Sequence, residues 1–289
     1  MATGTAEFID STTADVFIKE QWSTQAIVAR EQKLSFARNV DLKYKKDLSI
    51  GDIVNVPSLG NLAAQTKIKA NNTAVSFETI TETNTQITVA TWLYSGVAVE
   101  SIVKIQANMD LLMAYAPKQG YALAEGIDDT LAGHPDDFTN TTGTLGAGSA
   151  YTDYVRGIQY LDDAKAPSDG RVIIISPAER GNMLSMKEYV HNDYSSLHGD
   201  GPKVTQQEKD YVTSFLGYPV YVTTNAEGTN AAGHDNTMMH KEAIALIVQM
   251  EPTPWYMADA NFLVHKVVME ELYGSAILRN DHGVWQKGA

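Results

Sequence analysis

The chain has 289 residues, no cysteine, and 22 basic against 35 acidic side chains, which gives a formal net charge of −13. The lack of cysteine excludes disulfides and cysteine-bound zinc, and the negative charge opposes loose adsorption to nucleic acid or anionic lipid. Hydrophobic residues make up 44% and charged residues 20%, which is typical of a folded chain with one large domain or two closely connected ones.

The N-terminal segment differs in charge from the remainder of the chain. Residues 1–46 carry seven basic and six acidic side chains, so the acidity lies almost wholly after them. The opening MATGTAEFID has no secretion-signal pattern, and the longest apolar run, Ala243–Val248, is far too short to cross a bilayer, so no membrane partner is expected. Ser11 could cap a helix whose apolar residues, such as Phe17 and Trp22, are irregularly spaced. We interpret this segment as an arm that packs on something else, with an ordinary first core helix as the alternative.

From Leu48 to Trp92 the hydrophobic period changes to two, which indicates strands. The alternating positions are Ile53, Val56, Val75, Phe77, Thr79, Ile87, Val89 and Thr91. The polar stretch Pro57–Thr73 between them is typical of a hairpin tip. So few large apolar residues cannot bury much surface, and an isolated two-stranded ribbon is marginal in water. The hairpin therefore needs support from elsewhere, and the alternative is the edge of a larger sheet within the same subunit.

The longest helix signal spans Ser101–Ala132. Apolar side chains recur there at steps of three and four, and a helix of that length would span about 45 Å at 1.5 Å per residue. Pro117 lies inside it and is expected to kink the helix or divide it in two. Residues 133–150 follow as a predicted loop.

A second compact unit is predicted after this loop. It begins with a helix over Tyr151–Leu161 and a fully buried strand over Arg171–Ile175. A helix start then follows, with Ser176 as the N-cap, Pro177 in the first helical position and Glu179 completing a capping box.

The remainder of the chain is predicted to alternate loops with strands. Tyr189–Asp210 is a long polar loop, a length that usually indicates binding or another function. Phe215–Thr224 is predicted as a strand and Asn225–Thr237 as a further loop. Short apolar runs at 243–250, 262–269 and 276–278 predict closing strands, with breaks at Gly274 and Gly283.

Catalytic motifs are absent from the sequence. It contains no nucleophile elbow, zinc-binding helix motif, phosphate-binding loop or dinucleotide fingerprint. The candidate metal ligands are two histidine pairs with nearby aspartates: His191 and His198 with Asp193 and Asp200, and His234 and His240 around Asp235. Neither spacing matches a standard ligand pattern, and flexible loops hold ligands poorly. We therefore assign no catalytic residue, no metal site and no cofactor, and keep a metal-dependent enzyme as a minor alternative.

The charged clusters also have ordinary interpretations. Asp128–Asp129 and Asp136–Asp137 are sequence neighbours, which do not face each other on a helix, so these side chains are expected to be solvated. Lys43, Lys45 and Lys46 form a small basic cluster, too small for a nucleic-acid groove. We interpret it as a solvated turn before the hairpin.

The order of these parts resembles the Hong Kong 97-like fold of the major capsid proteins of tailed bacteriophages, from about Trp22 to the C-terminus. ALAEGIDDTLAG at 122–133 is similar to the end of that family's spine helix. GRVIIISPAER at 170–180 and FLGYPVYVTTN at 215–225 are similar to its axial domain. HKEAIALIVQM at 240–250 and ELYGSAILRNDHGVW at 271–285 are similar to the strands that lead back into its peripheral domain.

The resemblance implies an α+β fold with a defined division of the chain. The expected parts are an N-terminal arm (1–46), an extended β-hairpin loop (47–95), the spine helix with part of the peripheral domain (96–149), an axial α/β domain (150–249) and closing strands of the peripheral domain (250–289). The loop Tyr189–Asp210 would project toward the symmetry axis, and the arm would wrap adjacent subunits.

The resemblance also implies a structural, non-enzymatic function. The chain would self-assemble as hexamers and pentamers into an icosahedral shell that encloses double-stranded DNA without sequence-specific binding. Its partners would be its own copies, a separate scaffolding protein and a portal protein. It would be located in the virion capsid, and in the host cytoplasm during assembly.

Two other functions and one chemical detail are considered beside the capsid protein. An encapsulin-like compartment shares the fold and would enclose a cargo enzyme in place of DNA, and the metal-dependent enzyme is the third hypothesis. Lys67 or Lys69 could be placed like the hairpin lysine that forms a covalent cross-link in the family's prototype. No matching asparagine with an assisting carboxylate is identifiable, so no cross-link is expected.

Overall fold

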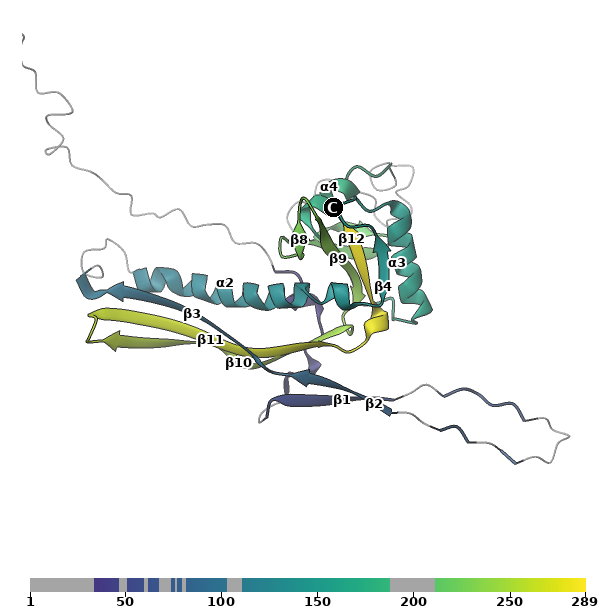
Figure 1. Ribbon diagram of the computed structural model, residues 1–289, viewed down its shortest axis with the longest axis horizontal. Helices are drawn as coiled ribbons and strands as arrows, with labels where there is room; N and C mark the ends of the chain where they lie inside the picture. Colours follow the sequence, from purple (N-terminus) through teal and green to yellow (C-terminus); the bar gives the residue numbers. More distant parts are fainter. Residues whose placement is uncertain are drawn as a thin grey trace, which may run out of the picture.

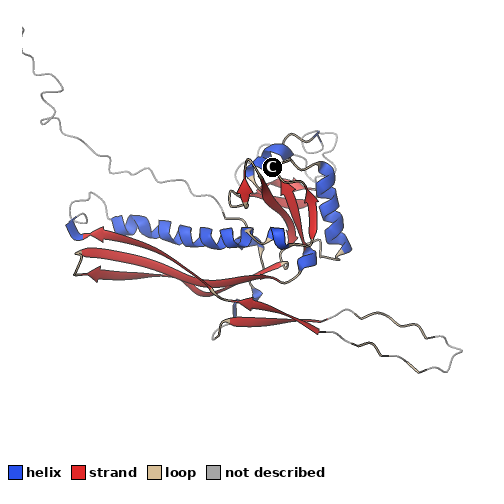
Figure 2. Cartoon of the chain, in the orientation of Figure 1, coloured by secondary structure: helices blue, strands red, loops and turns tan. Residues whose placement is uncertain are grey.

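The computed structural model describes residues 34–46, 51–59, 62–67, 74–75, 77–79, 82–102, 111–187 and 211–289. The chain is elongated and combines helices with sheets (Figures 1 and 2). A long helix lies along a long sheet, and a compact unit stands at one end of that sheet (Figure 1). A hairpin projects in the direction opposite to the free end of the sheet (Figure 1). The helix predicted near Ser11 and the loop predicted at 189–210 lie outside the described residues.

The long sheet has three antiparallel strands in the order β10-β11-β3. They are β3 (Thr91–Glu100), β10 (Ile244–Asp259) and β11 (Val264–Ile277). The sequence predicted short closing strands with a break at Gly274, but β11 continues through that residue. The register of β10 against β11 shifts between Val248 and Met250 and again before Thr253. These bulges interrupt the alternation of apolar and polar residues from which a long strand is predicted.

The predicted long helix is present as α2 (Leu111–Ala132), while residues 103–110 of the prediction lie outside the described part of the chain. Pro117 lies inside α2, which continues through it, so the helix is not divided in two, which was one of the two expected outcomes. Its ring is on the exposed side of the helix, where water can bond the carbonyl group left without an N–H partner. The helix comes very close to the sheet at Gly126, where an added Cβ would lie 2.6 Å from Leu93 Cδ1.

The compact unit is built on a seven-stranded sheet in the order β4-β12-β9-β5-β7-β6, with β8 paired to β9. Its strands are β4 (Asn140–Gly143), β5 (Arg171–Ile175), β6 (Tyr211–Phe215), β7 (Tyr218–Val222), β8 (Gly228–Thr229), β9 (Gly233–His240) and β12 (Gly283–Gly288). The last strand, β12, therefore lies between β4 and β9 in this sheet and not in the long sheet.

Two helices of the compact unit lie among the described residues, and both begin where the sequence predicts. They are α3 (Tyr151–Asp163) and α4 (Pro177–Met183). Ser176 Oγ accepts a hydrogen bond from the backbone N–H of Glu179 at 3.0 Å, as expected of an N-cap. The reciprocal half of the predicted capping box is missing, because the N–H of Ser176 donates to Asn236 Oδ1 at 2.6 Å. The Glu179 side chain is thereby free to turn inward.

The predictions for 215–237 are partly wrong. Phe215–Thr224 is not one strand, because the chain reverses at Leu216 and Gly217, whose φ values of 52° and 86° fit the two-residue turn that joins β6 to β7. The predicted loop 225–237 contains β8 and the start of β9. The sequence did not predict β9 because its polar residues are typical of a loop. In the structure Asn236 and Thr237 are fully buried, and both pair with β12.

The hairpin consists of β1 (Ile53–Leu59) and β2 (Glu82–Thr88), paired antiparallel as a separate two-stranded sheet. It is not the edge of a larger sheet. The predicted tip begins later than Pro57, which pairs with Asn84, and Val75 and Phe77 are not in a strand. Short 3₁₀ turns occur at η2 (Ala37–Asn39), η3 (Lys43–Lys46), η4 (Pro135–Asp137) and η6 (Asn280–His282).

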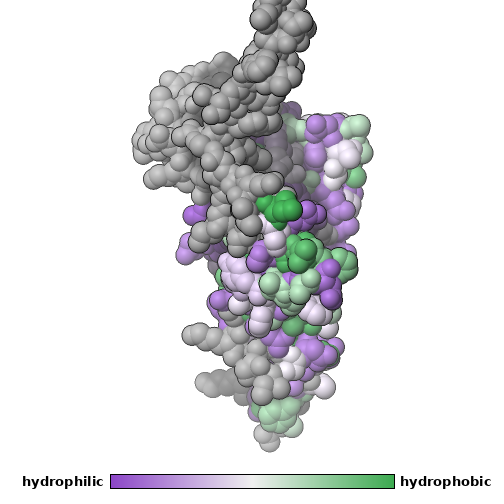
Figure 3. All heavy atoms as spheres, turned by 90° about the vertical axis from the view of Figure 1, so that its left-hand side faces the viewer, coloured by the Kyte–Doolittle hydropathy of each residue, from purple (hydrophilic) through white to green (hydrophobic). Residues whose placement is uncertain are grey.

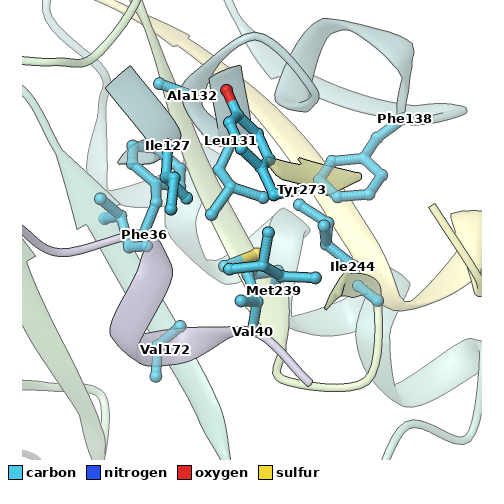
Figure 4. Packing of buried hydrophobic residues seen from close by; sticks show 13 residues of the cluster. Phe36, Val40, Ile127, Leu131, Ala132, Phe138, Val172, Met239, Ile244 and Tyr273 are labelled. Carbon is cyan, nitrogen blue, oxygen red and sulfur yellow. The ribbon is translucent and has the colours of Figure 1, made fainter. Parts of the chain in front are cut away.

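One hydrophobic cluster joins α2, both large sheets and the segment before the hairpin, at the end of α2 next to the compact unit (Figure 4). Phe36 comes from the segment before the hairpin, Leu131 from α2, Met239 from β9 and Tyr273 from β11, and all four are almost fully buried. Residues 34–46 thus pack on their own chain, and burial of aromatic side chains such as Phe36 contributes about 1.5–3 kcal/mol each. No described helix is long and apolar enough to span a membrane.

Candidate assembly interface

The long sheet has one covered face and one open face. Along β3 the side chains alternate, so that Leu93, Val97 and Val99 lie on the covered side, while Trp92 and Tyr94 are exposed. The covered face packs against α2, where Gln119 Nε2 donates to the Val267 carbonyl at 3.1 Å. No helix of the described residues lies over the opposite face (Figure 1).

Register between the strands brings aromatic and apolar side chains together on this open face. Tyr94 lies opposite Glu270, and Trp92 opposite Leu272, so all four share the face. Trp255 is opposite Val268 in the next strand pair, and Met257 opposite Lys266. The exposed fractions are 65% for Trp92, 78% for Tyr94, 59% for Trp255 and 66% for Met257. We call Trp92, Tyr94, Trp255 and Met257 the open-face patch.

The base of the hairpin covers the adjoining half of the same sheet. Val54, Ile87 and Val89 are buried in one cluster with Ala245 and Ile247 of β10, and Leu272 packs against that cluster. Leu272 is also the cross-strand neighbour of Trp92. Near the compact unit, this face of the long sheet is therefore already covered by the base of the hairpin. The open-face patch lies next to the covered part.

The distal turn of the long sheet is also apolar. Phe262 and Leu263, between β10 and β11, are exposed to 73% and 70%. The view onto this end of the molecule shows hydrophobic side chains gathered between polar ones (Figure 3). Exposed apolar groups so close together mark an interaction surface more often than single scattered ones do.

The projecting part of the hairpin carries its own unburied side chains. Leu62, Val75 and Phe77 are exposed to 68%, 60% and 93%. The two arms of the hairpin are joined by Glu78, which accepts hydrogen bonds from the Ala63 N–H at 3.0 Å and from Gln65 Nε2 at 2.6 Å. The hairpin and the tip of the long sheet point in opposite directions (Figure 1), so the two apolar surfaces cannot meet within one copy.

Of the four histidines that the sequence singled out, the structure describes His234 and His240. His234 and His240 lie at opposite ends of β9. The His234 ring hydrogen-bonds the Ala226 carbonyl at 3.2 Å and Asn230 Oδ1 at 3.0 Å. His191 and His198 lie outside the described residues, and no group of three potential metal ligands occurs among the residues that are described.

The interpretation of Asp128 as a solvated charge is wrong. Its side chain is fully buried, and its carboxylate accepts hydrogen bonds from the backbone N–H of Ala37 at 2.9 Å and of Ser35 at 3.4 Å. Asn225 Nδ2 donates to the same carboxylate at 3.3 Å. Desolvation raises the pKa of Asp128, although these hydrogen bonds oppose the rise. Asp128 thus fixes the segment before the hairpin to α2, whereas Asp129, Asp136 and Asp137 are exposed as predicted.

A polar groove lies between the hairpin base and the compact unit, with a volume of about 890 Å³. Lys43 lines it, and its Nζ lies 2.8 Å from Glu242 Oε1 and 3.3 Å from Asp41 Oδ2. The hydrogen bond to Glu242 raises the pKa of Lys43. This part of the predicted basic cluster therefore serves to hold the chain before the hairpin, and Lys67 on the hairpin is exposed.

Glu271 gives a first testable prediction. The side chain is only 2% exposed on the α2 side of β11, opposite Leu93, and no hydrogen bond or ion pair reaches it within the described part of the chain. Burial raises the pKa of Glu271. Because the folded-state pKa lies above the unfolded value near ~4.3, the ionised group destabilises the fold increasingly as pH rises through the folded pKa. We expect Glu271→Gln to raise the free energy of unfolding at pH 7 by about 1 kcal/mol.

Urea unfolding at pH 7 and at pH 4 measures this effect. The gain from Glu271→Gln should shrink at pH 4, where the wild-type carboxyl is mostly protonated in both states. The matched control is Glu270→Gln on the open face, where the carboxylate accepts a hydrogen bond from Trp92 Nε1 at 3.2 Å and is solvated. An equal gain for both variants would contradict the assignment of the effect to burial.

Several solved phage structures share this arrangement. A chain from the structure of Mycobacterium phage Che8 superposes with a TM-score of 0.80 at 21% sequence identity, over 94% of this chain and 97% of that one. A chain from the capsid structure of cyanophage P-SCSP1u gives 0.75 at 16% identity, over 99% and 95%. A chain from the mature capsid of bacteriophage PhiM1 gives 0.69 at 13% identity, over 93% and 91%. The chain has a phage capsid fold.

The capsid fold confirms the resemblance that the sequence motifs indicated. No family model matches the sequence, and no curated protein matches it. The fold is thus recognisable by its three-dimensional arrangement at identities of 21% and below. The open-face patch was not predicted, although Trp92 and Tyr94 at alternate positions of one strand were a usable signal.

Proposed function

We propose that this chain is the major capsid protein of a tailed phage, which assembles as hexamers and pentamers into an icosahedral shell around double-stranded DNA. The capsid fold supports this function. In this proposal α2 is the spine helix, the long sheet belongs to the peripheral domain, and the compact unit is the axial domain. The arm lies within 1–46, of which residues 34–46 pack on their own chain, and the hairpin lies within 47–95. The divisions 96–149 and 250–289 each also contribute one strand, β4 and β12, to the compact unit, and 150–249 includes the start of β10.

The observation that carries the proposal is the placement of two apolar surfaces that one copy cannot bring together. The projecting hairpin bears Leu62, Val75 and Phe77, and the long sheet bears the open-face patch. In the assembly, the hairpin of one copy lies across the sheet of the next. Such a contact joins two different surfaces, and its repetition around an axis generates a closed ring.

The charge of the chain suits a container. A formal charge of −13 opposes tight binding to DNA, so the enclosed genome stays free to enter and leave. The proposed partners are other copies of the chain, a separate scaffolding protein and a portal protein. The proposed location is the virion capsid, with assembly in the host cytoplasm.

Deleting residues 60–73 tests the function. The hairpin base stays in place through Val54, Ile87 and Val89, so the variant should remain folded, with its thermal unfolding within a few degrees of wild type. The deletion removes Leu62 and the segment of chain opposite Val75 and Phe77, so the projecting hairpin is lost and the variant should remain a subunit or a small oligomer. Light scattering after size exclusion, with electron microscopy, distinguishes megadalton shells from a chain of 31.6 kDa.

Three outcomes of this experiment would count against the proposal. A wild-type chain that stays monomeric at all concentrations and with scaffold present would contradict shell formation. Unchanged shells after the deletion would contradict the contact between hairpin and sheet. Uniform shells of the wild-type chain closed around a cellular enzyme would indicate the encapsulin-like alternative.

A further inference from the structure

Two connections between the compact unit and the long sheet lie side by side. The first runs from the end of β9 at His240 to the start of β10 at Ile244, and the second from the end of β11 at Ile277 to the start of β12 at Gly283. They are hydrogen-bonded to each other, because the N–H groups of Leu278 and Arg279 both donate to the Ala243 carbonyl, at 2.8 and 3.2 Å. A change of angle between the two sheets must move these linkers, together with residues 133–139, which join α2 to β4 (Figure 1).

Each linker contributes one buried histidine, and the two rings touch. His240 is 6% exposed and His282 5%. Their ring centroids are 6.0 Å apart, with the planes at 86°, an edge-to-face contact. His282 Nδ1 is buried and has no hydrogen-bond partner among the described residues.

Hydrogen bonds define the state of the His240 ring. Its Nδ1 faces the backbone N–H of Glu242 at 3.2 Å and must accept that bond, so Nδ1 carries no proton. Its Nε2 therefore carries the proton and donates to the Asp169 carbonyl at 3.0 Å. The turn at 241–243 is thus held by the neutral form of this imidazole.

Charged groups of both signs surround the pair. They are Arg171 on β5, which is paired with Asp162 of α3, and Lys241, Glu242, Arg279 and Asp281 in the linkers, with Lys43 bound to Glu242. Burial lowers the pKa of His282, with further lowering from Arg279 and His240, while Asp281 and Glu242 oppose it. Asp281 Oδ2 lies 4.0 Å from His282 Nε2, a weak contact.

We propose that His240 and His282 form a proton-operated hinge between the compact unit and the long sheet. A proton on His240 Nδ1 would place two donors face to face and break its bond with the Glu242 N–H. A proton on His282 would add a second positive charge beside the first ring. Both changes loosen the paired linkers and let the compact unit tilt against the long sheet.

The direction of the pH dependence follows from the burial of the neutral His282 ring, which lowers the pKa of that group. A histidine whose folded-state pKa is lowered stabilises the closed junction fully above the ordinary value near ~6.5, and this contribution is lost as pH falls through that value toward the folded pKa. The hinge is a property of the single chain and goes beyond the proposed shell. In a shell, it would let acidification change the shape of every subunit at the same joint.

Hydrogen–deuterium exchange of the full chain tests the hinge at pH 7.5 and 5.5, with labelling times scaled for the chemical exchange rate. The protection of a peptide spanning 240–246 should fall about five- to tenfold at pH 5.5, while that of β5 at 171–175 stays constant. The glutamine amide in His240→Gln can donate and accept hydrogen bonds without titrating. In this variant the protection of 240–246 should fall less than twofold between pH 7.5 and 5.5. The second variant, His282→Phe, keeps the ring contact with His240. Its fall in protection of 240–246 at pH 5.5 should be smaller than that of the wild-type chain.

Two results would overturn the hinge. One is equal protection of 240–246 at both pH values in the wild-type chain. The other is a loss of protection that persists unchanged in both variants. Because exchange is read on the polypeptide whether it is assembled or not, a negative result here leaves the proposed shell standing, and a chain that fails to assemble can still show the hinge.

Discussion

Replacing Trp255 and Tyr94 with aspartate should leave a folded subunit that no longer forms particles. The two side chains are 59% and 78% exposed in the single chain, so the new carboxylates would be solvated there. In the proposed assembly the same positions are covered by the hairpin of another copy, and an unpaired charge buried at an interface costs about 3–5 kcal/mol. Repeated at every contact of a ring, such a cost prevents closure.

The comparison of particle yield with subunit stability decides this prediction. Electron microscopy and light scattering measure particles, and urea unfolding measures the subunit, which should change by less than about 0.5 kcal/mol. The matched controls are Trp255→Phe and Tyr94→Phe, which keep most of the apolar area and should still assemble. Normal yields of particles from the aspartate variant would show that the open-face patch is not an interface.

Local features of the fold could be predicted from the sequence because their causes lie within a few residues. The start of α4 depends on Ser176 and Pro177, and the burial of β5 depends on its run of isoleucines. The periodicity of α2 predicted its end at Ala132. At Pro117 the helix is not divided, because the proline is exposed and water can bond the carbonyl group that its missing N–H leaves unpaired.

Features that depend on distant partners could not be predicted. Asp128 looked like one of two solvated neighbours, but its partners Ala37 and Asn225 are 91 and 97 residues away in the chain. Glu179 looked like a capping residue, but its carboxylate turns toward residues at 149, 154 and 289. Such polar contacts follow no period and come into view only when the sheets are assembled.

Only one of the two surfaces of the candidate interface, the hairpin, was predicted from the sequence. The polar hairpin with few large apolar groups indicated a ribbon in need of a partner, and Phe77 at 93% exposure agrees with this. The surface proposed to receive it was not predicted, because it combines β3 with β10, which are about 150 residues apart in the sequence. Bulges in β10 also hide the alternation that places Trp255 on the open face.

Glu179→Ala should destabilise the compact unit by about 3–5 kcal/mol. The carboxylate is fully buried and accepts hydrogen bonds from the Tyr154 hydroxyl at 3.0 Å, the Ser149 N–H at 3.2 Å and Asn182 Nδ2 at 3.1 Å. The N–H of Ala289 donates to its other oxygen at 3.0 Å. Removing the carboxylate leaves these buried donors without an acceptor, and α3, α4 and the end of β12 lose their common contact.

A double-mutant cycle with Tyr154→Phe distinguishes this network from simple loss of packing. Burial raises the pKa of Tyr154 well above its ordinary value, so the hydroxyl stays protonated and donates to Glu179. Tyr154→Phe alone should cost about 1–2 kcal/mol, because the ring contact with Phe215 at 5.0 Å is kept. In the Glu179→Ala background the same change should cost much less, since the bond it removes is already gone. Urea unfolding of the four proteins measures the coupling, and strictly additive losses would show that Glu179 and Tyr154 act independently.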